Sequence, residues 1–142
     1  MASVPLHYVD LRTFCYATED DKRVEDALGT YLPDGFPIER AETEGFHGDR
    51  ILVLSARVET ADDVRVVLDR LRELPDLGTV DGELDDRVTE NCEFYITLDK
   101  QAASRGEVAR GDGLTLRAKV EAYPAKKEAA VENVRAVLAG EY

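Results

Sequence analysis

The stretch LHYVDLRTFCY, residues 6–16, predicts the strand around which the rest of the chain is arranged. Because successive side chains of a strand point to opposite faces, it has two rows. One row holds His7, Val9, Leu11, Thr13 and Cys15, and the other holds Tyr8, Asp10, Arg12, Phe14 and Tyr16. Both rows are rather apolar, which is typical of a strand at the centre of a sheet, so we expect pairing on both sides.

The rest of the chain predicts three main helices and four more strands. Helices are expected from a Thr18 cap to the Pro33-Asp34-Gly35 stop and over residues 60–74 and 126–138. Strands are expected over residues 38–44, 50–58, 93–98 and 114–123, with the polar segment 38–44 at an edge. Residues 76–91 indicate a short, weak helix, and residues 99–105 a helical turn capped by Asp99.

These elements predict one α+β domain over residues 1–142. A single curved, mostly antiparallel sheet of about five strands would be backed by three main helices, in the order β-α-β-β-α-β-β-α. Short connections and the absence of a linker or internal repeat favour a single unit.

The chain is strongly acidic. It has 142 residues, with 18 Lys and Arg against 30 Asp and Glu, and a formal net charge of −12. Acid spread along the whole chain, with more Arg than Lys and no Trp, is typical of an organism with molar intracellular salt, where the Debye length is roughly 3 Å. The sequence predicts no signal peptide and no membrane span, which favours a cytoplasmic protein.

One stretch reverses this bias. Residues 99–127, which we call the basic island, carry seven Lys or Arg and four acids, a net charge of +3 against −15 for the remainder. A cationic region on an acidic protein favours a phosphate-bearing partner such as RNA. The alternative is a solvated surface that binds nothing.

Alternation within the basic island predicts a surface for RNA. In the strand at 114–123, Arg117, Lys119 and Tyr123 would share the outward face, with the two cations about 7 Å apart. Tyr95, on the neighbouring strand, would point the same way. Cations and aromatic rings on one open sheet face suit base stacking, although Tyr is also common on ordinary half-exposed sheets.

Three more cations complete this prediction. Arg110 lies in a glycine-rich loop from which its guanidinium could reach an RNA backbone. Lys126 and Lys127 begin the last helix, where cations oppose the helix dipole but add to the attraction of free N–H groups for phosphate.

The sequence favours a binding protein over an enzyme. It has no phosphate-binding glycine loop, nucleophile elbow or zinc motif. Cys15 and Cys92 stand alone in apolar contexts, and His7 is expected to pack against the core. His47 lies in a glycine loop beside Arg50, where it could contact phosphate, act as a general base or cap a carbonyl. We therefore expect no catalytic residue, no metal ion and no cofactor.

Several motifs together carry a resemblance to a known family. They are YVDLR at residues 8–12, EGFHGD at 44–49, FYITLDKQAASR at 94–105 and GLTLRAKVEAYP at 113–124. The chain resembles an archaeal family of predicted RNA-binding proteins with a fold like the double-stranded-RNA-binding domain, also described as predicted exosome subunits. The resemblance covers nearly the whole chain and implies a haloarchaeal member.

A second, weaker likeness is to the ribosomal large-subunit protein that binds 5S rRNA. It rests on DKQAA at residues 99–103, Gly106 and the strand that follows Gly113. It implies a curved sheet backed by helices, and it marks Lys100, Gln101 and Arg105 as RNA-contacting positions.

These observations predict a non-enzymatic protein that binds structured or double-stranded RNA. It would be an accessory of RNA processing or exosome-type degradation, with exosome or ribosome-related proteins as partners. The alternative is a protein–protein adapter or homodimer module that uses the exposed sheet face without touching RNA. The predicted RNA-binding residues are Tyr95, Lys100, Gln101, Arg105, Arg110, Arg117, Lys119, Tyr123, Lys126 and Lys127, with His47 and Arg50 as a separate loop site.

Overall fold

The computed structural model describes residues 4–45 and 47–142. Its strands are β1 (Leu6–Tyr16), β2 (Glu39–Glu44), β3 (Arg50–Val58), β4 (Glu93–Asp99) and β5 (Gly113–Val120). Its helices are α1 (Asp21–Gly29), α2 (Ala61–Leu71), α3 (Leu77–Gly82), α4 (Leu84–Arg87), α5 (Lys100–Ser104) and α6 (Lys127–Leu138).

All five strands form one antiparallel sheet in the order β2-β3-β1-β5-β4. The prediction that residues 6–16 occupy the centre is confirmed, because β1 pairs with β3 on one side and β5 on the other. The predicted edge strand is confirmed in β2, which begins one residue later than expected and is exposed along its whole length.

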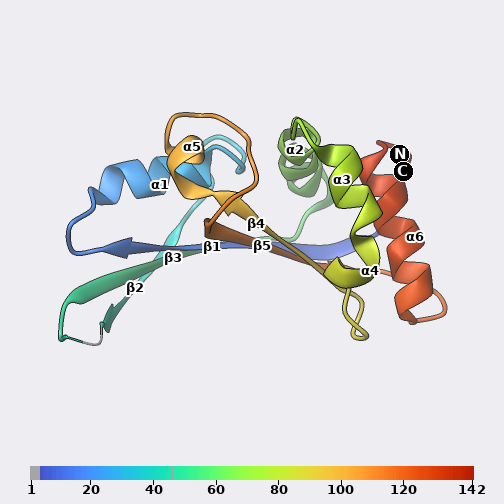
Figure 1. Ribbon diagram of the computed structural model, residues 1–142, viewed down its shortest axis with the longest axis horizontal. Coiled ribbons are helices and arrows are strands. Elements are labelled where there is room, and N and C mark those ends of the chain that lie inside the picture. Colours follow the sequence, from blue (N-terminus) through green and yellow to red (C-terminus); the bar gives the residue numbers. More distant parts are fainter. Residues whose placement is uncertain (1–3, 46) are drawn as a thin grey trace.

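The helices all cover the same face of the sheet, and the other face is open (Figure 1). Helices α1 and α5 pack together over one half, while α2, α3, α4 and α6 cover the other. Between them and the sheet lies the core, in which Leu11, Leu54, Ile96 and Leu116 are almost fully buried. The predicted α+β architecture is thus confirmed.

Side-chain caps explain where α1, α2 and α5 begin. Thr60 accepts a hydrogen bond from the Asp63 amide before α2, and Asp99 accepts one from the Ala102 amide before α5. The prediction that Thr18 caps the first helix is wrong. The chain first turns, with the Glu19 amide donating to the Tyr16 carbonyl, and Asp20 caps α1 instead.

The face of one strand residue and the end of one strand also differ from expectation. A bulge between Leu6 and Tyr8 shifts the alternation of β1, so Leu6 is buried and His7 is exposed. The strand predicted over residues 114–123 ends at Val120. Its partner β1 begins at Leu6, opposite Val120, so no strand remains for the residues up to Tyr123 to pair with.

Residues 76–91, for which the sequence indicates a weak helix, form the two short helices α3 and α4. Val80, Leu84 and Val88 are buried against the core, which anchors this acidic segment. Among the described residues, no helix has the length and apolarity that a membrane crossing requires.

Candidate nucleic-acid interface

The open face of the sheet brings together side chains from strands that are distant in sequence. Register places Asp10 of β1 between Arg57 of β3 and Arg117 of β5. The next outward position of β1, Arg12, lies between Ser55 and Thr115. These rows cross the middle of the sheet, on the side that no helix covers.

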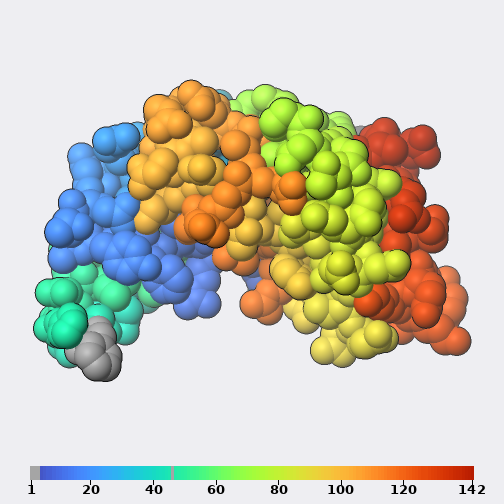
Figure 2. Space-filling view, in the orientation of Figure 1, coloured from blue at the N-terminus to red at the C-terminus, as the bar shows by residue number. Residues whose placement is uncertain are grey.

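The open face is concave. Side chains of β1, β3 and β5, together with Phe36 and Pro37, line a hollow of about 1080 Å³ that contains Arg12, Arg57 and Arg117. Figure 2 shows it from the side, as the space under an arch. One foot of the arch holds the β2–β3 hairpin, and the other holds the segment before β4 and the start of α6.

The cations of this face differ in how they are paired. Arg57 donates two hydrogen bonds to the carboxylate of Asp10, at 2.8 and 2.9 Å, and these bonds raise its pKa. Arg117 lies 3.5 Å from a Glu93 oxygen, in a pair whose arginine is exposed. Arg12 is exposed, and no carboxylate in residues 4–45 or 47–142 lies within ion-pair distance of it.

Aromatic rings accompany these guanidinium groups. Arg57 lies over the ring of Tyr8, 4.0 Å from its centre, and Arg12 lies 5.2 Å from the centre of Phe14. Phe14 also stacks with Tyr16, with 6.4 Å between ring centres. Aromatic rings and guanidinium planes both stack on bases, and the charge of the guanidinium also attracts phosphate. The face therefore has the chemistry of a nucleic-acid platform.

The structure places three of the predicted RNA-binding residues on this face. Tyr95 is 41% exposed, and its hydroxyl donates to the Asp86 carbonyl, which orients the ring. It lies opposite Arg117 in the register of β4 and β5. Lys119 faces the same side, next to Tyr8, and its ammonium donates to the carbonyl of Asn91.

Three others lie at one foot of the arch. Tyr123 is 83% exposed and lines, with Lys119 and His7, a hollow of about 380 Å³. Lys126 occupies the N-cap position of α6, but its side chain makes no capping hydrogen bond, and Lys127 is the first residue of that helix. They border the open face without lying on the strands that form it.

The remaining residues of the basic island lie among the helices. The Lys100 ammonium donates to the Phe14 carbonyl at 3.0 Å and to Glu19 at 2.8 Å, and the side chain is 10% exposed. Arg110 is tied to Asp76 at 2.7 Å and to Glu83 at 3.0 Å, so the guanidinium expected to reach an RNA backbone is anchored instead. The basic island is therefore not one surface.

Two neighbours of Lys100 complete this group. Gln101 is exposed on α5. Arg105 follows that helix and lies 3.6 Å from Glu107, in a pair of which both members are exposed.

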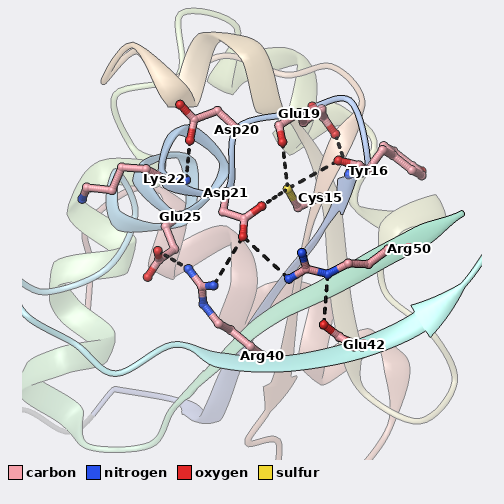
Figure 3. A network of polar contacts seen from close by, with 10 residues as sticks. All are labelled: Cys15, Tyr16, Glu19, Asp20, Asp21, Lys22, Glu25, Arg40, Glu42 and Arg50. Atoms are coloured by element: carbon pink, nitrogen blue, oxygen red, sulfur yellow. Dashed lines mark hydrogen bonds and ion pairs between the residues drawn. The ribbon is translucent and has the colours of Figure 1, made fainter.

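The predicted loop site lies at the other foot of the arch. Arg50 points toward the helices, 3.0 Å from Glu42 and 3.9 Å from Asp21, as Figure 3 shows. Arg40 of β2 reaches the same Asp21 and also Glu25, so the network ties the hairpin to α1. His47 is exposed in the turn, and its neighbour Phe46 lies outside the described residues.

Sequence reasoning missed Arg12, Arg57, Tyr8 and Phe14 as site residues. The signal was present for three of them, because alternation within residues 6–16 placed Tyr8, Arg12 and Phe14 in one row. They lie in the acidic part of the chain, so a search for local positive charge passes over them. Arg57 joins them only through the pairing of β3 with β1.

Within the parts of the chain that the structure describes, no group of three or more His, Cys, Asp or Glu could hold a metal ion. Cys15 and Cys92 are both buried and free. Burial, followed by a hydrogen bond to Asp21, raises the pKa of the Cys15 thiol, which keeps it protonated.

Comparison with known proteins shows the family. Residues 8–120 match the model of a family described as RNA binding. The chain belongs to this RNA-binding family. It is 39% identical to the RNA-binding protein PAB1135 of Pyrococcus abyssi, over 95% of each chain. It resembles the structure of Mth689, a DUF54 protein from Methanothermobacter thermautotrophicus, with 39% identity, a TM-score of 0.79, and 94% of this chain and 98% of that one covered.

The family match includes the residues placed above on the open face. The residues of this chain that match the family model, 8–120, include Tyr8, the first aromatic residue of that face, and all of β5, which ends at Val120. The match does not include Tyr123, Lys126 or Lys127.

Proposed function

We propose that this chain binds RNA through the open face of its sheet and performs no chemical step on it. The observation that carries the proposal is Arg12. Its exposed guanidinium lies in the hollow, beside Phe14, with no carboxylate partner among the described residues of a chain whose net charge is −12. Because this guanidinium also lies on a concave face beside an aromatic ring, it is placed to bind an anionic ligand that carries bases.

The chemistry of this face favours RNA over a protein partner. The central rows of the face contain Asp10, Arg12, Arg57 and Arg117. Arginine and aromatic residues are enriched at protein–protein interfaces too, but three guanidinium groups on one concave face match the repeated phosphates of a nucleic acid more closely. The name of the Pyrococcus relative and the family description support the same conclusion.

The cellular role we propose is that of an accessory in RNA processing or exosome-type degradation. It is supported by the resemblance of the sequence motifs to predicted exosome subunits. Purification of the tagged chain from its native cells tests it, with exosome core subunits expected to copurify after nuclease treatment. Recovery of RNA without these subunits would leave RNA binding standing and remove the exosome role.

High salt constrains how the face would bind. Simple phosphate contacts weaken steeply as salt rises. If the acidic composition reflects molar intracellular salt, stacking on the rings must supply much of the affinity, because stacking depends less on ionic strength. We therefore expect binding to persist, though weaker, at molar KCl.

A charge-matched pair of variants tests the site. Arg12→Glu and Arg105→Glu change the net charge equally, but only the first lies on the open face. We expect Arg12→Glu to weaken binding of a fluorescent RNA by about tenfold or more, because a charge-assisted contact is worth roughly 1.5–3 kcal/mol. Arg105→Glu should weaken it less than about threefold, since exposed charges beyond a Debye length are screened.

Fluorescence anisotropy measures the affinities, and urea unfolding checks that both variants remain folded. Equal effects of the two variants would show that RNA senses only the overall charge, which contradicts the proposed site. Sedimentation of the wild-type chain tests the adapter or dimer alternative. A stable dimer that Arg12→Glu dissociates, with no RNA binding, would replace the proposed function.

A further inference from the structure

We infer that the open face selects unpaired RNA and discriminates against the duplex. This deepens the RNA-binding function proposed above and rests on it. The inference starts from a difference in what the two forms of RNA expose. In a duplex, both faces of each base are covered by its neighbours, whereas an unpaired base can lie on an aromatic ring or a guanidinium plane.

The rings on this face are placed for such stacking. Tyr8 and Phe14 lie on β1, six residues apart, which corresponds to about 20 Å along the strand. Each has an arginine at its ring, Arg57 for Tyr8 and Arg12 for Phe14. A chain of a few unpaired nucleotides that follows β1 would meet the Phe14 ring at one end and, at the other, the guanidinium plane of Arg57 that covers the Tyr8 ring.

Cations lie along the same path. Lys119 pairs with Tyr8 in the register of β5, and Arg117 pairs with Asp10 one step further along the strand. Arg12 follows in the middle of β1. A single phosphate backbone running beside β1 would therefore pass cations from β5 and β1 in succession, while its bases turn toward the rings.

The border of the hollow disfavours a duplex. The strands β3, β1 and β5 span about 10 Å, and recognition of double-stranded RNA requires phosphate contacts on both strands over roughly 16 base pairs. On one side the hollow is bordered by β2, where Glu39 lines it together with Glu59, which follows β3, and these two carboxylates would face the second row of phosphates. The one cation of β2, Arg40, is held by Asp21 and Glu25 of α1.

A direct test compares one RNA in two forms. The probe is a labelled RNA of about 12 nucleotides without self-complementarity, used alone and annealed to its complement. We expect the wild-type chain to bind the single strand at least about tenfold more tightly, as measured by anisotropy at the same salt concentration.

Two variants locate the stacking. Phe14→Leu keeps an apolar side chain and removes the ring, and we expect it to weaken single-strand binding by about fivefold or more. The matched control is Tyr142→Leu, which removes a ring that also packs on an arginine, Arg72, but among the helices. The control should leave both affinities unchanged, and urea unfolding confirms that each variant is folded.

The outcomes separate this inference from the function on which it rests. If the duplex binds as tightly as the single strand and Arg12→Glu weakens both, RNA binding stands and the selection of unpaired RNA is overturned. An unchanged single-strand affinity in Phe14→Leu also overturns it. If the wild-type chain binds neither RNA, or forms a dimer that Phe14→Leu dissociates, the proposed function itself fails.

Discussion

On the helix side of the molecule, the Lys100 ammonium is buried and donates to the Phe14 carbonyl and to Glu19. On the open side, the Arg12 guanidinium is exposed and lies at the ring of the same Phe14. The two cations thus lie on opposite sides of one residue of β1, and they have different roles. Lys100, which belongs to the basic island, stabilises the fold, while Arg12, from the acidic remainder, is available to a ligand.

This contrast shows that local charge in a sequence does not define a charged surface. Arg110 and Arg117 are seven residues apart in the basic island, yet one is anchored between two carboxylates and the other is exposed on the open face. What a cation can bind depends on which carboxylates the fold brings to it. The variants below test that difference, from the largest expected effect to the smallest.

Lys100→Met should cost the most stability. The change preserves an apolar stem of similar length but leaves the Glu19 carboxylate without its cation and removes a donor to the Phe14 carbonyl, and breaking a largely buried pair costs about 3 kcal/mol. Urea unfolding measures this loss, and Gln101→Ala, at the exposed neighbouring position, should change stability by less than about 0.5 kcal/mol. A Lys100→Met protein of normal stability but impaired RNA binding would contradict the division between the two faces.

The same ion pair should make folding sensitive to acid. Burial raises the pKa of Glu19, but hydrogen bonds from Lys100 and from the Tyr16 amide outweigh it and hold the pKa below its ordinary 4.5. The stabilisation is therefore present above the pKa of the unfolded state and is lost as the pH falls through the lowered folded value.

Glu19→Gln tests this dependence. At neutral pH it should cost about 1–2 kcal/mol, because Lys100 loses its charged partner. Between about pH 5 and pH 3 its unfolding free energy should fall less than that of the wild type, as chemical unfolding at several pH values would show. Parallel curves for the two proteins would mean that the pair does not contribute.

Arg117→Ala and Arg110→Ala should differ in the salt dependence of RNA binding. Each phosphate contact to a single strand contributes about 0.7 to the slope of log affinity against log salt. Removing Arg117 should lower the slope by about that amount, whereas removing Arg110 should leave it unchanged. Anisotropy titrations over a range of KCl concentrations give both slopes, and equal slopes would remove Arg117 from the site.

Asp10→Asn should have the smallest effect, in the opposite direction. Asp10 is the carboxylate that Arg57 binds, and it lies beside Arg117 in the hollow. Removing its charge frees Arg57 and relieves repulsion of phosphate, so we expect RNA affinity to rise by about two- to threefold, as is usual for an exposed pair. A weaker affinity would show instead that Asp10 positions Arg57 for binding.

Much of the fold could be predicted from local pattern. The bounds of β1 and β3 follow from alternation, and the cap at Thr60 follows from residue type. The errors occur where a distant segment decides. Tyr123 was expected on a strand, but the partner strand ends opposite Val120. His7 lies in a bulge because β1 has one residue more than β5 between two paired positions, and this difference exists only once the two strands pair.

The candidate site could be predicted only in part. Tyr95, Arg117 and Lys119 share a face because adjacent strands of an antiparallel sheet keep their outward rows together. Arg57 could not be assigned, since nothing local in β3 indicates that it lies beside Asp10. The anchoring of Arg110 by Asp76 and Glu83 depends on α3 and α4, which come earlier in the chain.

By itself, the order of residues determined which segments become strands and helices and which row of each strand is apolar, because these properties arise from spacings of two to four positions. Tertiary packing alone decided which cations come together on the open face of the sheet, and which of them remain without an acid there. Ion pairing and stacking act over a few ångströms in space, and the groups they join, such as Arg57 and Tyr8, are far apart along the chain.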